Sequence, residues 1–300
     1  MNWNARNVNM VTIMPEASAP SLFVHAPGEY LRYRVVGQGP HHIVLLHGFA
    51  ASLHTWDDLA PLFPATEFTL HLLDLAGHGH SSKLPDGDYS ALHNARITTA
   101  YIRSRQLTDV TLMGHSFGGA VALFTALGCP EARRLILIGA PGFPQRVPPF
   151  MRILGLPFIG PLLMGAVPAG TIARTALKRA FYRHELITEQ LVERYAAGYR
   201  CQGASTALSR TVRQILPPNA AQLVAGYADL AIPVLLMWGE HDRIVRPWQG
   251  ERLHRELPDA RLVIIPGCGH NPHEERPRET FALIRRFLSA CGVDIRQHTC

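Results

Sequence analysis

Apolar runs recur along the chain, and most of them are followed by a segment whose apolar residues repeat at helical spacing. The runs predict strands, and the segments between them predict helices. The expected strands are residues 22–25, 30–36, 42–47, 68–73, 109–113, 134–138, 232–238 and 261–265. The expected helices are residues 53–63, 89–106, 117–127, 247–256 and 280–289. This alternation predicts the α/β class, with a mostly parallel central sheet flanked by helices.

The connection between the first two expected strands is too short to hold a crossover helix, because it consists of little more than the turn at Pro27 and Gly28. We therefore expect these strands to form an antiparallel edge of the sheet. In parallel sheets of this class the reactive side chains lie at the carboxyl ends of the strands. The residues that directly follow the apolar runs are therefore the candidates for chemistry.

The alternation breaks at residues 142–228, which begin with a proline-rich stretch and continue with helix-like segments and no clear buried-strand pattern. We expect this segment to be a helical cap inserted into an α/β core of residues 21–141 and 229–290. Residues 1–20 are expected to be a disordered or loosely packed N-terminal segment, and residues 291–300 a C-terminal tail. The chain is thus expected to form one large domain with an insertion.

Composition places the chain among globular proteins, because 47% of its residues are hydrophobic and 17% are charged. The net charge is +6, and residues 142–228 hold ten arginine or lysine residues but only three acidic ones. Such an excess can attract nucleic acid, anionic lipid or acidic substrates, or it can be a solvated helix surface. No nucleic-acid-binding motif accompanies the charge, so no nucleic-acid partner is expected.

The cysteine pattern favours a reducing compartment, because the five cysteines are scattered and no C-x-x-C pair occurs. The same pattern argues against a metal site or a redox dithiol. The apolar run at Met10–Met14 is shorter than a secretory signal peptide requires. A cytoplasmic location is therefore expected.

Residues 153–173 carry no charge and are nominally long enough to span a bilayer. Three prolines and four glycines interrupt this run, which argues against a spanning helix. We favour an apolar lid that lines an acyl pocket, and the alternatives are simple packing onto the sheet and transient contact with a lipid surface. The cations that would assist contact with lipid are Arg152, Arg174, Lys178 and Arg179.

The stretch LMGHSFGGA at residues 112–120 places Ser116 where an apolar run gives way to a helical pattern. A tight strand-to-helix turn exposes a serine hydroxyl at its apex, and Gly114 and Gly118 relieve the crowding of the backbone. Together with His115 they form a candidate nucleophile elbow. The amino end of the following helix would direct positive potential at the reacting centre. Taken alone, the pattern also fits an ordinary turn capped by a serine.

A serine nucleophile requires a base that takes its proton and an acid that orients the base. His270 is the candidate base, because it follows a late apolar run on the glycine-rich loop PGCGH. The strand after the expected cap ends in WGEHD, which offers Asp242 as the acid and Glu240 as the alternative.

Two backbone amides are needed to hold the developing oxyanion. The run HIVLLH is followed by Gly48, which allows the chain to bend, so that the amide of Phe49 can pair with that of Phe117. His47 is expected to brace this loop rather than to act as a second base.

Five segments resemble motifs of the α/β-hydrolase fold superfamily, and they occur in its order of nucleophile, acid and histidine. They are HGF (47–49), DLAGHGHS (74–81), GHSFGG (114–119), WGEHDRIV (238–245) and GCGHNPHEERP (267–277). The resemblance covers nearly all of the chain outside the expected cap and the termini. It implies Ser116 as the nucleophile, Asp242 as the acid and His270 as the base. It also implies that the amides of Phe49 and Phe117 form the oxyanion hole.

The serine at position 116 distinguishes this chain from the haloalkane dehalogenases and epoxide hydrolases of the superfamily. A resemblance to those enzymes would require a carboxylate at this position. Ser116 suits an acyl-enzyme formed from an ester, a thioester, an amide or an activated ketone. Many carbon–carbon bond hydrolases of the superfamily carry a tryptophan after the catalytic histidine, where this chain has Asn271. In the DLAGHGHS loop, His78 and His80 are expected to be structural.

We therefore expect a serine esterase or lipase-like hydrolase that cleaves carboxylic esters of small molecules with apolar acyl chains. Neither a metal ion nor an organic cofactor is expected. One alternative is a carbon–carbon bond hydrolase of aromatic ring-cleavage products. The other is a ligand-binding or accessory protein with little turnover. The sequence leaves the physiological substrate and the oligomeric state open.

Overall fold

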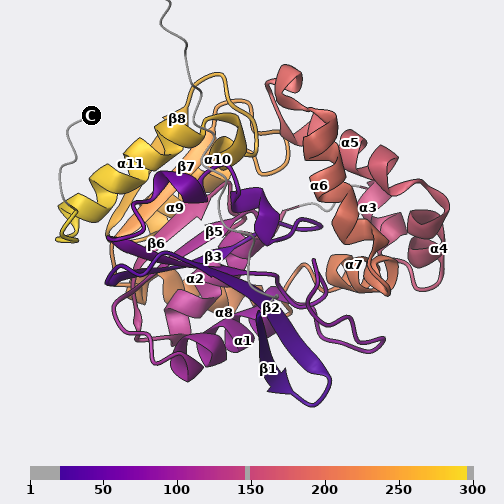
Figure 1. The fold of residues 1–300 in the computed structure, drawn as a ribbon, viewed down its shortest axis with the longest axis horizontal. Coiled ribbons are helices and arrows are strands. Elements are labelled where there is room, and N and C mark those ends of the chain that lie inside the picture. Colours follow the sequence, from indigo (N-terminus) through magenta and orange to yellow (C-terminus); the bar gives the residue numbers. More distant parts are fainter. Residues whose placement is uncertain (1–20, 146–148, 296–300) are drawn as a thin grey trace, which may run out of the picture.

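The computed structural model describes residues 21–145 and 149–295, and it builds them around an eight-stranded sheet (Figure 1). The strands are β1 (Ser21–Ala26), β2 (Glu29–Val36), β3 (His41–Leu46), β4 (Phe68–Leu73), β5 (Val110–His115), β6 (Ala132–Ile138), β7 (Val234–Gly239) and β8 (Ala260–Ile265). Their order is β1-β2-β4-β3-β5-β6-β7-β8. In this order, every neighbouring pair from β4 through β3 to β8 is parallel, and β2 is antiparallel to both of its neighbours, β1 and β4. The mostly parallel sheet and its antiparallel edge are as predicted.

Helices cover both faces of the sheet, because alternate strand residues point to opposite sides. Leu112 of β5 packs in a cluster with helices α1 and α2, whereas the adjacent Met113 packs in a second cluster with α11. The helices and 3₁₀ turns of this core are η1 (Leu53–Trp56), η2 (Ala60–Leu62), α1 (Ala91–Ser104), α2 (Phe117–Gly128), α9 (Trp248–Glu256), α10 (Pro272–Glu275) and α11 (Pro277–Ala290). The sheet is thus buried on both sides, as its continuous apolar runs predict.

The segment between β6 and β7 contains helices and no strand within its described residues. Its elements are α3 (Pro149–Leu154), α4 (Ile159–Ala166), α5 (Ala169–Ala180), η3 (His184–Leu186), α6 (Glu189–Arg200), α7 (Ala204–Arg213), α8 (Ala220–Ala225) and η4 (Gly226–Asp229). Helices α3 to α7 lie together beside the sheet, and we call residues 149–213 the helical insertion (Figure 1). Its helices α5 and α6 share a small apolar core of their own. The role of this segment as a cap stays a prediction.

Two expectations about helices are wrong in detail. Residues 53–63 form two short 3₁₀ turns instead of one helix, because Pro61 has no N–H to donate to a residue four positions earlier. Helix α11 begins at Pro277 rather than at Thr280, and proline suits the first turn of a helix because that N–H has no intrahelical partner. The expectations for residues 1–20 and 296–300 lie outside the described residues.

Across the described ranges, no helix combines the length and the apolar character needed to cross a membrane. The uncharged run of residues 153–173 is divided among α3, α4 and α5. Pro157 and Pro168 lie in the two breaks, where proline cannot continue a helix.

Candidate active site

Ser116 lies at the turn between β5 and α2, with a φ of 52° and a ψ of −121°. A positive φ is uncommon for a residue with a side chain and marks a strained turn. The amide of Ser116 donates to the carbonyl of Ile138 on the adjacent strand at 2.9 Å, which fixes the turn at the carboxyl edge of the sheet. The structure therefore has a strained strand-to-helix turn at Ser116, and the role of this turn as a nucleophile elbow stays a prediction.

The glycines on both sides of Ser116 are required by close backbone contacts. A Cβ atom on Gly114 would lie 2.3 Å from the carbonyl oxygen of Gly118, and one on Gly118 would lie 2.3 Å from that of His47. Real Cβ contacts are never this short, so any side chain would force the strand and helix apart. These two glycines let α2 start directly behind the serine.

His270 and Asp242 form a buried pair after two neighbouring strands. The Nδ1 atom of His270 lies 2.7 Å from Oδ2 of Asp242. The other carboxylate oxygen, Oδ1, accepts the amides of Ile244 and Val245 at 2.8 and 2.9 Å. Glu240 instead accepts the amide of Gly267 at 3.1 Å. Of the two acids that the sequence offers, Asp242 is thus the one that contacts the imidazole.

The neighbour of Ser116 in sequence connects the elbow to the histidine loop. The Nε2–H of His115 donates to the carbonyl of His270 at 3.0 Å, and the two rings pack with centroids 4.7 Å apart. Burial holds the pKa of His115 well below its ordinary value, so the ring is neutral. Within the described part of the chain, the hydroxyl of Ser116 makes no hydrogen bond. The structure therefore brings His270 and Asp242 into a bond and puts Ser116 on the segment packed against them.

The loop after β3 lies against the elbow. A Cβ atom on Gly48 would lie 3.2 Å from the Cβ of Ser116, so this position must stay small. His47 accepts the amide of Leu75 at Nε2 and donates through Nδ1 to the carbonyl of Gly48. These bonds agree with the expected bracing role of His47. The amide of Phe49 makes no hydrogen bond within the described residues, which leaves it free to donate.

The amide of Phe117 is also free to donate, because Phe117 is the first residue of α2 and the first N–H groups of a helix have no intrahelical acceptor. The ring of His78 packs against both Phe117 and Phe49, with centroids 5.9 Å away in each case. Burial lowers the pKa of His78 to about 3, so it packs as a neutral ring. His78 therefore holds together the two residues predicted to form the oxyanion hole.

A carboxylate that the sequence reasoning missed joins the histidine loop to the helical insertion. Glu275 is buried and accepts three backbone amides at 2.9 Å, from Gly269 of the loop and from Tyr182 and Arg183 of the insertion. The amide of His270 itself donates to the carbonyl of Ala180 at 2.7 Å. The backbone of the predicted base is thus held by the insertion. The only sequence signal was the position of Glu275 in the motif GCGHNPHEERP.

A second missed group is Glu274, whose side chain is buried. Its Oε2 atom accepts the hydroxyl of Tyr195 from helix α6 at 2.7 Å and the side-chain amide of Asn271. Burial raises the pKa of the Glu274 carboxyl to about 7. The hydroxyl of Tyr195 also lies 3.3 Å from Oγ1 of Thr55, so this network joins the insertion to the core as well.

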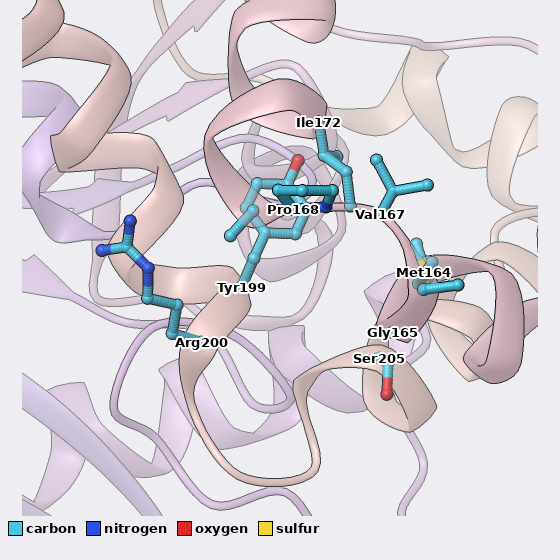
Figure 2. Close-up of a pocket in the computed structure, with 10 residues that line it drawn as sticks. Met164, Gly165, Val167, Pro168, Ile172, Tyr199, Arg200 and Ser205 are labelled. Atoms are coloured by element: carbon cyan, nitrogen blue, oxygen red, sulfur yellow. The ribbon is translucent and has the colours of Figure 1, made fainter.

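A pocket of about 370 Å³ opens within the helical insertion (Figure 2). Val167, Pro168, Ile172 and Tyr199 group together in its lining, and Ser205 lies at its edge. All of its lining residues come from helices α4 to α7 and the segments joining them, and none belongs to the predicted catalytic set. The pocket and the candidate site are therefore separate features. Among the residues that the structure describes, no three histidine, cysteine or acidic side chains are arranged to hold a metal ion.

Comparisons with known proteins place this geometry in context. An uncharacterized protein of Mycobacterium tuberculosis is 30% identical over 292 residues, which cover 91% of this chain and 82% of that protein. A pimeloyl-[acyl-carrier protein] methyl ester esterase of Neisseria meningitidis is 28% identical over 251 residues, covering 82% and 93% of the two chains. A solved meta-cleavage product hydrolase from Pseudomonas fluorescens superposes with a TM-score of 0.74 at 21% identity, over 89% of this chain and 96% of that one. The model of the alpha/beta hydrolase family matches residues 43–283, and the chain belongs to this family.

Proposed function

We propose that the protein is a serine hydrolase that cleaves carboxylic esters through an acyl-enzyme. The observation that carries the proposal is the buried 2.7 Å bond between His270 and Asp242 beside the strained turn at Ser116. A histidine held by a carboxylate at Nδ1 presents Nε2 as the base. A serine at such an elbow is the group that gives its hydroxyl proton to this base. Hydrolase chemistry as a class agrees with the family.

In the proposed reaction, the oxygen of Ser116 attacks the ester carbonyl while His270 accepts its proton. The oxyanion that forms takes hydrogen bonds from the amides of Phe49 and Phe117. Protonated His270 then gives the proton to the leaving alcohol. A water molecule, activated by the same imidazole, releases the acid and regenerates Ser116. The carboxylate of Asp242 keeps the ring oriented and stabilises its positive charge throughout.

The choice of an ester rests on two supports. The relative from Neisseria meningitidis is named as a methyl ester esterase. An ester also has a better leaving group than an amide, so a serine forms an acyl-enzyme from it more readily. The proposed preference for apolar acyl chains rests on the part of the uncharged run 153–173 that lines the pocket in the helical insertion, which includes Met164, Val167 and Ile172.

The test combines covalent labelling with a substrate series. A fluorophosphonate should add one adduct to the wild type, mapped to Ser116, and none to Ser116→Ala. Ser289→Ala, which removes an exposed hydroxyl on α11, should label normally. Among nitrophenyl esters, turnover should rise from acetyl to medium-length chains. Turnover of acetyl and propionyl esters alone would contradict the apolar preference.

Two outcomes would replace the proposal. Turnover of vinylogous diketones formed by ring cleavage, with poor activity on simple esters, would indicate a carbon–carbon bond hydrolase. A burst equal to one acyl group per chain, followed by negligible steady-state hydrolysis, would indicate an accessory or ligand-binding protein. Ser116→Ala serves as the control for both measurements, because it removes only the attacking oxygen.

A further inference from the structure

The helical insertion exposes a group of large apolar side chains on α3, on α4 and on the turn between them. Phe158 is 89% exposed and Leu162 is 72% exposed. We call the whole group the apolar tip, and its members are Ile153, Leu156, Phe158, Ile159, Leu162 and Leu163. Single exposed apolar residues are ordinary, but a contiguous group of this kind marks a surface that contacts something.

The outward direction of the apolar tip is fixed by the packing of α4. Gly160 faces helix α7, because a Cβ atom there would lie 2.7 Å from Oγ of Ser209 and 1.9 Å from the carbonyl oxygen of Leu154. Phe158 is held at a φ of 62°, which is rare for a bulky residue. Helix α4 lies on the side of the insertion away from the sheet (Figure 1). The apolar tip is therefore an outer surface of the molecule.

Two exposed cations lie next to the apolar tip. Residues 149–213 contain nine arginine or lysine residues and three glutamates. Five of these cations pair with acidic residues, but the exposed Arg152 and Arg213 form no ion pair with any described residue. Arg152 precedes the tip on α3, and the side chain of Arg213 lies beside Gly155 at the start of the turn. Two unpaired guanidinium groups thus flank the exposed apolar residues.

We propose that the apolar tip inserts shallowly into an anionic lipid surface, with Arg152 and Arg213 at the level of the headgroups. Apolar side chains flanked by cations are the composition that binds the interface of a bilayer without crossing it. A second copy of the chain is a poorer occupant, because it would bring two insertions of the same positive charge together. The proposal is independent of the proposed ester hydrolysis.

The test is flotation of the full chain with vesicles of phosphatidylcholine, alone or mixed with phosphatidylglycerol. The wild type should float with the mixed vesicles, and less so as salt is raised. Phe158→Glu combined with Leu162→Glu should weaken this binding at least about tenfold, because the two apolar side chains that would enter the lipid become charged. Arg152→Glu combined with Arg213→Glu should abolish the preference for phosphatidylglycerol.

Val24→Glu is the matched control, because Val24 is 67% exposed on β1, outside the insertion. Val24→Glu should bind vesicles as the wild type does. The two double variants, of the tip and of the arginines, should keep the far-ultraviolet circular dichroism of the wild type. The proposal is wrong if the wild type does not float, or if the tip variant floats unchanged. It is also wrong if sedimentation velocity shows a dimer that the tip variant dissociates, since a second copy would then be the occupant.

Discussion

The imidazole of His270 bonds Asp242 at 2.7 Å, whereas Glu240, two residues earlier, accepts the amide of Gly267. The two carboxylates thus share a loop but have different partners. Asp242 is buried and receives three hydrogen bonds, while Glu240 is exposed. Of these two carboxylates, Asp242 is the one placed to orient the ring in the proposed reaction. This contrast supplies an internal control for the proposed triad.

We expect Asp242→Asn to lower kcat for nitrophenyl esters by about 10³- to 10⁴-fold, because the amide favours the wrong tautomer of His270. Glu240→Gln should change kcat by less than about twofold, since the substituted group does not contact the ring. Steady-state kinetics of the two variants, with folding checked by thermal unfolding, make the comparison. Equal losses in both variants would contradict the assignment of the acid.

The sheet and the tight turn at Ser116 could be predicted because their signals are local. The run before Ser116 and the glycines after it specify a strand, a turn and a helix within ten residues, and the structure follows them. The pairing of His270 with Asp242 was predictable for another reason. Parallel strands end at one edge, so residues after β7 and β8 must meet there.

The contacts of the helical insertion could not be predicted, because they join residues far apart in the chain. Glu275 accepts the amide of Tyr182, and Tyr195 donates to Glu274, yet no periodicity links these positions. The failure at residues 53–63 has a different cause. The apolar spacing there was helical, but Pro61 prevented the backbone bonds that a helix requires.

The elbow glycine offers a prediction about stability. Gly118→Ala should destabilise the protein by about 3 kcal/mol or more, because the added methyl would press on backbone atoms of β3 that cannot move. Gly128→Ala, at the other end of α2, has nothing within 4 Å of the new methyl. That control should be neutral or stabilising by up to about 1 kcal/mol. Urea unfolding measures both, and a stable Gly118→Ala would contradict the packing described for the elbow.

The clamp made by Glu275 predicts a joint loss of stability and activity. Glu275→Ala leaves one buried and two half-buried amides without their acceptor and should cost about 3 kcal/mol. It should also lower kcat, because the loop that carries His270 loses part of its attachment to the insertion and keeps the bond from the amide of His270 to the carbonyl of Ala180. Hydrogen exchange should speed up in residues 267–271 and in residues 180–183 together. Glu279→Ala, an exposed position on α11, should change stability by less than about 0.5 kcal/mol.

Glu274 predicts a particular dependence of stability on pH. Burial raises the pKa of its carboxyl from 4.5 to about 7 in the folded protein. Between these values the unfolded chain loses the proton while the folded chain keeps it, so this group lowers stability as pH rises through that window. Below pH 4.5 both states are protonated and above about pH 7 both are ionised, so the full loss is reached near neutrality. The predicted total is on the order of 3 kcal/mol.

Glu274→Gln removes this titration and can still accept the hydroxyl of Tyr195 through its amide oxygen. The free energy of unfolding of this variant, relative to wild type, should therefore increase between pH 5 and about pH 7.5 and level off beyond it. Urea titrations at four pH values in this range measure the difference. Glu251→Gln, an exposed position on α9, controls for the amide substitution itself. A difference between Glu274→Gln and wild type that is constant across the range would show that Glu274 is already ionised inside the folded protein at pH 5.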